Sequence, residues 1–367
     1  MFDRLLSFRD VGETMMFACL GGLLFGLIGV PAGYLSGSIL GVACAALAGR
    51  PMRVPVPMMQ VLLVLIGISL GAVVTPETLR GMATYPVSIG VLIVATAVIS
   101  FVGTAYLRAV HRFDLLTAYL AATPGGLSQV MALAIEFKAD VRAIVIVQTV
   151  RVVIVAIGFP LLLSAIGLGG ETVQRTIGGT FEISDLGELA VLIAACTIVA
   201  ILAYKVRFPG GLLFGAMLTS AALHGSGILH VVMPWWVAYT VMMFFGAVAG
   251  SRFAGTPVQL LLRFVGAAFG SFATALVITA IFAGLLVQLL PLPLAEVMIA
   301  YAPGAVDAML LLALALNLDP VYVGAHHLTR IFLVMATTPL IVRHRISGPV
   351  QPDAPEKPAT PQRPFED

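Results

Sequence analysis

The sequence predicts an all-α polytopic membrane protein made of two related halves. Of its 367 residues, 60% are hydrophobic and only 10% are charged, and the mean hydropathy is +1.05. Soluble domains carry about 25% charged residues. The apolar residues form successive runs separated by short loops, a pattern typical of membrane-spanning helices. The chain also repeats itself at a spacing of 179 residues, which indicates an internal duplication.

Each half contains six apolar runs. In the first half they lie near 14–29, 33–48, 57–74, 84–107, 115–135 and 141–166, and in the second near 187–204, 210–223, 235–250, 259–290, 295–316 and 320–342. The expected surroundings are therefore the lipid bilayer. The domain organisation that follows is an N-terminal segment 1–11, repeat 1 at 12–166, an acidic linker 167–186, repeat 2 at 187–343 and a Pro-rich disordered tail 344–367.

The duplication keeps unusual residues in register. Arg151 aligns with Arg330, and Pro124 aligns with Pro303. The same spacing relates Gly67 to Gly246, Gly71 to Gly250, Gly125 to Gly304, Asp140 to Asp319 and Pro160 to Pro339. Glycines four residues apart are typical of close helix packing, and this spacing occurs at Gly22–Gly26, Gly33–Gly37, Gly67–Gly71 and Gly246–Gly250.

Loop charges indicate that the second half is inverted. Basic residues mark cytoplasmic loops. In the first half these are Arg50, Arg53, Arg108 and Arg112; in the second they are Lys205, Arg207, Arg252 and Arg263, in non-equivalent loops. Inversion requires an odd number of crossings, so we predict five transmembrane helices and one re-entrant segment per half, about 10–12 membrane segments in all, with cytoplasmic termini. The alternative is a crossing helix broken at its middle, which gives twelve spans.

The re-entrant candidates are "ATPGGLSQVMALA" (122–134) and "YAPGAVDAMLLLA" (301–313). Each carries a Pro-Gly break inside an apolar run, where irregular backbone survives only beside protein or water. Broken helices in inverted halves are a recurrent way to build a midplane site in secondary transporters. We expect Thr123 to cap a new helix at Pro124 whose N–H groups face an anion or polar oxygen. A kinked core helix without ligand is the alternative.

Polar residues at membrane depth complete the candidate site. Arg151 and Arg330 lie inside apolar runs, where an ionisable group indicates function. We expect Asp307 to pair with Arg330 and Arg151 to contact backbone carbonyls, which leaves one guanidinium for a carboxylate or other oxyanion. Asp307 and His327 are also candidates to carry a proton. The predicted solute site comprises Thr123, Pro124, Gly125, Gly126, Ser128, Gln129, Gln148, Arg151, Pro303, Gly304, Asp307, His327 and Arg330.

The sequence indicates no metal, cofactor or catalytic residue. His326 and His327 are adjacent, so on a helix they point about 100° apart, unlike a chelating i, i+4 pair. Cys19, Cys44 and Cys196 lie in apolar runs without CxxC spacing. The chain contains no Walker loop, Rossmann glycine pattern or nucleophile elbow. A net charge of +2 gives no indication of a nucleic-acid partner, and a homo-oligomer stays open.

The two halves carry the motif pair "ATPGGLSQVMALAIEFKAD…QTVR" and "YAPGAVDAMLLLALALNLDP…HHLTR". On these motifs the chain resembles the AbrB-type duplicated membrane family of bacteria over nearly its whole length except the tail. Members are often labelled ammonia monooxygenases or regulators of gene expression. The resemblance implies a multi-pass protein of the bacterial inner membrane. Three functions follow in order of preference: a secondary transporter or exporter of a small polar or anionic solute, a membrane sensor or regulator that moves nothing, and a membrane monooxygenase, which would need copper or iron.

Overall fold

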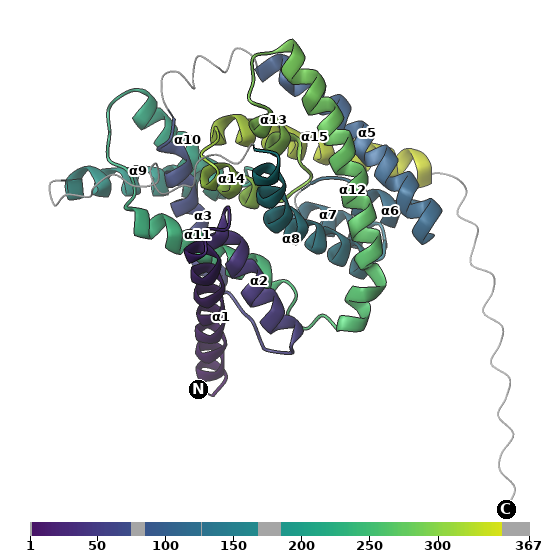
Figure 1. The fold of residues 1–367 in the computed structure, drawn as a ribbon, viewed down its shortest axis with the longest axis horizontal. Helices are drawn as coiled ribbons and strands as arrows, with labels where there is room; N and C mark the ends of the chain where they lie inside the picture. Colours follow the sequence, from purple (N-terminus) through teal and green to yellow (C-terminus); the bar gives the residue numbers. More distant parts are fainter. Residues whose placement is uncertain (1, 75–84, 126, 168–184, 347–367) are drawn as a thin grey trace, which may run out of the picture.

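The computed structural model describes residues 2–74, 85–125, 127–167 and 185–346, and over these residues it is all-helical (Figure 1). The first half contains α1 (Phe2–Leu27), α2 (Gly33–Leu47), α3 (Val56–Gly71), α5 (Tyr85–His111), α6 (Leu115–Ala122), α7 (Leu127–Glu136) and α8 (Val141–Ala165). The second half contains α9 (Leu186–Lys205), α10 (Gly211–Gly225), α11 (Trp235–Ser251), α12 (Val258–Leu289), α13 (Leu294–Tyr301), α14 (Val306–Ala315) and α15 (Pro320–Ile346). Most of the predicted linker and tail lies outside the described residues.

Every predicted apolar run coincides with a helix, and the two Pro-Gly runs are each split into two. Among the described residues, five helices are long and apolar enough to cross a membrane: residues 8–27 of α1, and α5, α8, α9 and α12. The helices α2, α3, α10 and α11 have 15 to 17 residues, or about 22–26 Å at 1.5 Å per residue. The all-helical, membrane-type fold is therefore confirmed, while the number of crossings stays a prediction.

The two halves pack against each other through equivalent helices. Within each half, α1 packs on α2 and α9 packs on α10. Across the halves, α3 packs on α10, α11 packs on α2, and α5 packs on α12. In Figure 1, α8, α13, α14 and α15 lie between α9 and α10 on one side and α5 and α6 on the other. The second Pro-Gly break, between α13 and α14, therefore lies among the central helices, and the buried Thr123 shows that the first break is also enclosed by protein.

Glycines make the crossings between the halves close. A side chain at Gly67 of α3 would clash with the Leu213 carbonyl oxygen of α10. At the equivalent position of the second half, a side chain at Gly246 of α11 would clash with Ser38 of α2. The four-residue glycine spacing in the sequence is thus confirmed as a packing signal, because only a hydrogen at these positions lets the backbones approach.

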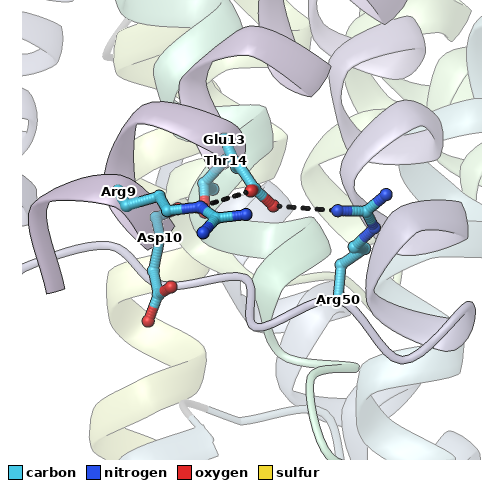
Figure 2. Close-up of polar contacts among 5 residues, drawn as sticks. All are labelled: Arg9, Asp10, Glu13, Thr14 and Arg50. Carbon is cyan, nitrogen blue, oxygen red and sulfur yellow. Dashed lines mark hydrogen bonds and ion pairs between the residues drawn. The ribbon is translucent and has the colours of Figure 1, made fainter. Parts of the chain in front are cut away.

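Polar contacts near the N-terminal end of α1 connect this helix to the loop after α2. Figure 2 shows Glu13 between two arginines: Arg9 Nε donates to Glu13 Oε1 at 3.2 Å, and Arg50 Nη1 lies 3.6 Å from Glu13 Oε2. The buried Thr14 hydroxyl donates to the Asp10 carbonyl and accepts from the Arg53 N–H at 2.9 Å. The predicted N-terminal segment, from its second residue, is part of α1, since this helix begins at Phe2.

The core is deepest around the second break. Every residue from Ala308 to Leu316 is buried, and this segment belongs to one apolar cluster that includes residues of both halves. By contrast, Ile135 of α7 is 66% exposed and the neighbouring Glu136 is also exposed. The two broken segments are therefore equivalent in sequence but enclosed to different degrees.

We predict that Gly67→Ala destabilises the protein by about 1–3 kcal/mol, because the added methyl group must displace the backbone of α10. Thermal unfolding of the purified protein in detergent measures the effect. Gly90→Ala is the matched control: Gly90 is also inside a helix, and its added methyl group meets open space, so its unfolding midpoint should not fall. Equal midpoints for both variants would contradict the close crossing of α3 and α10.

Candidate functional site

Both breaks have the same backbone geometry. Helix α6 ends at Ala122, and Thr123 then takes an extended conformation with φ −63° and ψ 125°. Helix α13 ends at Tyr301, and Ala302 repeats this conformation with φ −58° and ψ 140°. A residue before proline is driven out of the helical region by contact with the proline ring. Pro124 and Pro303 therefore stop both helices at equivalent points.

The predicted role of Thr123 as the cap of a new helix is wrong. Thr123 follows the last residue of α6, and its N–H donates to the Tyr119 carbonyl at 2.9 Å. The next helix, α7, begins only at Leu127. The interruption is longer than the sequence suggested, because the chain leaves the helical conformation at Thr123 and the next helix begins only at Leu127, so Pro124 is not the first residue of a helix.

The carbonyl end of α6 is capped by side chains of α8. The last carbonyl groups of a helix have no partner within it and carry partial negative charge. Arg151 Nη1 donates to the carbonyl oxygens of Ala122 at 3.1 Å and Ala121 at 3.4 Å. Gln148 Nε2, one turn earlier on α8, donates to the Leu120 carbonyl at 2.8 Å. The prediction that Arg151 contacts backbone carbonyls is confirmed.

The second half repeats this arrangement with α13 and α15. Arg330 Nη1 donates to the Ala302 carbonyl at 2.9 Å and Nη2 to the Ala300 carbonyl at 3.1 Å. His327 takes the place of Gln148: its Nε2 contacts the Ile299 carbonyl at 3.2 Å, and its Nδ1 contacts Arg330 Nη2 at 2.9 Å. These partners fit a neutral imidazole with the proton on Nε2. Equivalent residues thus make equivalent contacts 179 positions apart, as a duplication requires.

The predicted pair of Asp307 with Arg330 is wrong. Arg330 makes no ion pair, and the ion pairs among the described residues both involve Glu13. The reason is position along the broken segment: Arg330 lies at the carbonyl end of α13, whereas Asp307 is the second residue of α14, beyond the break. A carboxylate at the start of a helix is already favoured by the positive helix end.

Three buried side-chain atoms have no hydrogen-bond partner within the described protein: Thr123 Oγ1, Thr149 Oγ1 and Arg151 Nε. Thr123 is 1% exposed and Arg151 is 2% exposed. A buried polar atom left without a partner costs about 1–3 kcal/mol. Two of the three atoms belong to the residues that form the first break, so binding capacity remains at that break after its carbonyls are capped.

A cavity of about 670 Å³ reaches the first break between α5, α6 and α15. Hydroxyl groups of α5 line it at four-residue spacing, so they share one helix face; they belong to Thr96, Ser100 and Thr104. Thr123 lies on its wall, and Arg108, exposed and in no ion pair with described residues, lies at one end. Most of the remaining lining is apolar.

A polar cluster that the sequence analysis missed joins α5 to α13 and α15. The Ser88 hydroxyl lies 2.5 Å from the Tyr322 hydroxyl and 2.7 Å from His326 Nε2, and Tyr301 donates to the Ser88 carbonyl at 2.5 Å. His326 Nδ1 contacts the Tyr322 carbonyl at 2.7 Å. Both nitrogens of His326 are therefore engaged in hydrogen bonds. The sequence signal was the presence of tyrosines and a histidine in apolar runs, but their common partner is 213 to 238 residues away.

An acidic pair lies at the edge of this cluster, just before α15. Asp319 caps that helix by accepting from the Val321 N–H at 2.8 Å, and it accepts from the Tyr85 hydroxyl at 3.3 Å. Its own N–H donates to Glu296 at 3.3 Å. Burial raises the pKa of the Asp319 carboxyl above its usual value, while the backbone N–H bonds oppose that shift.

The structure brings most of the predicted site residues to one of the two breaks. Thr123, Pro124, Gln148 and Arg151 surround the first, and Pro303, Gly304, His327 and Arg330 surround the second. A side chain at Gly125 would lie 3.4 Å from Val334 of α15, so the first break also touches the other half. Gly126 and the side chains of Ser128 and Gln129 lie outside the described residues. No group of three or more His, Cys, Asp or Glu residues that could hold a metal ion occurs in the described part of the chain.

Comparisons with known proteins point to one family. The sequence model of the family described as "Transition state regulatory protein AbrB" matches residues 34–345. The chain is 24% identical to the "Uncharacterized protein YhjN" of Bacillus subtilis (strain 168), covering 89% of this chain and 91% of the relative. It is also 24% identical to the "Putative regulator AbrB" of Escherichia coli (strain K12), covering 90% of this chain and 95% of the relative.

We predict that Arg330→Met lowers the free energy of unfolding by about 3 kcal/mol or more, because methionine fills the space but leaves buried carbonyls of α13 without a donor. Arg151→Met should have a smaller effect, since Arg151 contacts fewer carbonyls. Thermal unfolding in detergent ranks the variants. Arg108→Met is the control, because Arg108 is exposed, and its midpoint should equal that of the wild type. An Arg330→Met midpoint equal to the wild type would refute the capping role.

Proposed function

The chain belongs to the AbrB family, and with that premise we propose that it is a secondary transporter of a small polar or anionic solute. The proposed solute site lies near the middle of the membrane, between the two Pro-Gly breaks. We further propose that each half contributes five crossings and one re-entrant segment, that the halves are inverted, and that both termini face the cytoplasm of a bacterial cell. The binding of a solute between two broken helices is the arrangement that recurs in carriers with inverted repeats.

The observation that carries the proposal is the pair of equivalent breaks, each stabilised by a buried arginine of its own half. The breaks also contact the other half: Gly125 lies against Val334 of α15, and α14 packs on α8. A movement of one half relative to the other would therefore change the surroundings of both breaks together. Such coupling is what alternating access around a central site requires.

Charge at the breaks favours an anionic solute. Arg151 and Arg330 are both buried, and neither forms an ion pair with a described carboxylate. At the first break, Arg151 Nε and Thr123 Oγ1 remain without hydrogen-bond partners. A guanidinium N–H and a hydroxyl are suited to a carboxylate or a similar oxyanion, because charge-assisted hydrogen bonds are roughly twice as strong as neutral ones.

The difference between the halves supports a carrier in one of two states. The first break lies beside the cavity between α5, α6 and α15, whereas α14 after the second break is buried from Ala308 to its end. In the proposed topology Arg108 lies at the cytoplasmic end of α5, so the cavity leads from the cytoplasm to the first break. Rocking of the halves would close this route and open the equivalent one on the other side.

A second candidate is a membrane regulator that affects gene expression without transport. The printed name of the Escherichia coli relative, "Putative regulator AbrB", favours it. A regulator that binds a solute at the same breaks would share the binding site but would not move the solute. Uptake into proteoliposomes that contain only this protein separates the two functions, because a regulator would show binding without uptake.

A thermal-stability screen in detergent identifies the solute. A compound that binds the folded state raises its apparent stability, and the screen compares small carboxylates, amino acids, phosphate, sulfate and ammonium. Uptake of each stabilising compound is then measured in proteoliposomes. The proposal requires at least one compound that both stabilises the protein and is taken up. If none of the stabilising compounds is taken up, the regulator is the function instead.

We predict that Thr123→Val weakens binding and uptake of that compound about tenfold, the effect of a lost hydrogen bond to a charged group. The isosteric change removes a hydroxyl that has no partner in the described protein, so stability should not fall. Thr149→Val is the matched control, because its hydroxyl is equally buried and unpartnered but does not line the cavity. Equal uptake by the two variants would place the solute away from the first break.

A further inference from the structure

We infer that the ligand of the cavity beside the first break is an amphiphilic organic acid, with one carboxylate and an unbranched apolar body. This inference rests on the proposed function and names the substrate class of the same site. It concerns the space between α5, α6 and α15, which the two arginines of the breaks do not fill. Binding and transport are separate measurements, so either one can fail alone.

The volume and walls of the cavity fit an apolar body. Its volume of about 670 Å³ lies within the range of about 300–1,000 Å³ found for small-molecule sites. Apolar side chains from all three helices line it, among them Phe101, Leu116 and Leu333. Small hydrated anions such as sulfate would leave these walls in contact with water, which is unfavourable in proportion to the apolar area.

The cavity is elongated along α5. Its lining on that helix extends from Ile93 to Arg108, about 22 Å at 1.5 Å per residue. On α15 it extends from Leu333 to Ile341, and on α6 from Leu115 to Thr123 beyond its end. A compact solute would occupy only part of this length, whereas an extended chain contacts all three helices at once.

Two polar groups of the cavity lining, Arg108 at one end and Thr123 at the first break, can interact with a carboxylate. Arg108 is exposed at the cytoplasmic end and can attract a carboxylate. Deeper in the cavity, the Thr123 hydroxyl is buried without a partner, next to the Ala122 carbonyl that Arg151 caps. We place the carboxylate at Thr123 and the apolar body back along the cavity toward Arg108. A neutral hydrocarbon would leave the Thr123 hydroxyl unpaired.

The equivalent helix of the second half, α12, carries fewer hydroxyl groups at the corresponding positions. The positions equivalent to Thr96, Ser100 and Thr104 are Ala275, Thr279 and Ala283, so two of the three hydroxyl groups are replaced by methyl groups. The Thr279 hydroxyl donates to the Tyr301 carbonyl at 3.3 Å. The row of three hydroxyl groups is therefore particular to α5 and is not a general consequence of the duplication.

The test measures binding of decanoate to the purified full-length protein by thermal stabilisation. Acetate, sulfate and 1-decanol are compared with it, because they carry the charge without the chain or the chain without the charge. We expect decanoate to raise the unfolding midpoint by a few degrees at saturation and the other three to leave it unchanged. Stabilisation by acetate or sulfate equal to that by decanoate would overturn the inference while leaving the proposed function intact.

Ala105→Phe places a bulky side chain in the cavity, and Ala109→Phe is its matched control. Both residues are exposed on α5, but only Ala105 lines the cavity. We predict that Ala105→Phe weakens decanoate binding at least tenfold and that Ala109→Phe leaves it unchanged. Binding that is unchanged in both variants would mean that decanoate acts outside the cavity, for example through the detergent. Equal weakening by both would show no dependence on the cavity lining, and either result overturns the inference.

Two further outcomes separate the inference from the proposed function. Native mass spectrometry of the purified protein would overturn the inference if it found a phospholipid that decanoate does not displace, since the cavity would then be a lipid site. Decanoate binding that depends on Ala105, without decanoate uptake into proteoliposomes, would support the amphiphile site and overturn transport as its function.

Discussion

The structure depends on how two helices can stop in the apolar interior of the protein. The last carbonyl groups of α6 and α13 have no partner within their helices, and an unsatisfied backbone group in lipid costs several kcal/mol. Arg151 and Arg330 donate to these carbonyls. The positive guanidinium also faces the negative end of the helix, which lowers the electrostatic cost of burying it. The breaks and the buried arginines therefore stabilise each other: without the arginines the carbonyls would lack donors, and without the carbonyls the buried guanidinium groups would lose these acceptors.

This mutual stabilisation explains why both halves have an arginine and a second polar residue at equivalent positions, although other residues around the breaks differ. Each half needs a donor one turn before its arginine, and Gln148 and His327 both meet that need through carbonyls of the preceding half-helix. The residues around the breaks are less constrained. Ala122 is small and packs on Gly103 of α5, whereas the equivalent Tyr301 fills the interior and joins the Ser88 cluster. An equivalent backbone thus supports two breaks with different polar surroundings.

Much of the fold could be predicted because its signals are local. The apolar runs, the Pro-Gly interruptions and the glycine spacing each depend on neighbouring residues, and each coincides with a helix, a break or a close crossing. The site was predicted in part. The residues at the breaks were identified, but the Asp307–Arg330 pair was wrong because the direction of a long side chain depends on which helix end it meets. Backbone carbonyls were expected as partners of Arg151 and are also the partners of Arg330, where the sequence suggested a carboxylate instead.

By itself the sequence determined the composition, the duplication, the helices and the positions of the two breaks, because periodicity, proline and glycine act through the chain next to them. Tertiary structure alone decided which atoms face each other across the halves. It placed Ser88 against Tyr301, Tyr322 and His326, and it formed the cavity beside Thr123 from helices of both halves. Those outcomes depend on side-chain volume and on contacts between residues more than 200 positions apart, and no local pattern in a single sequence encodes them.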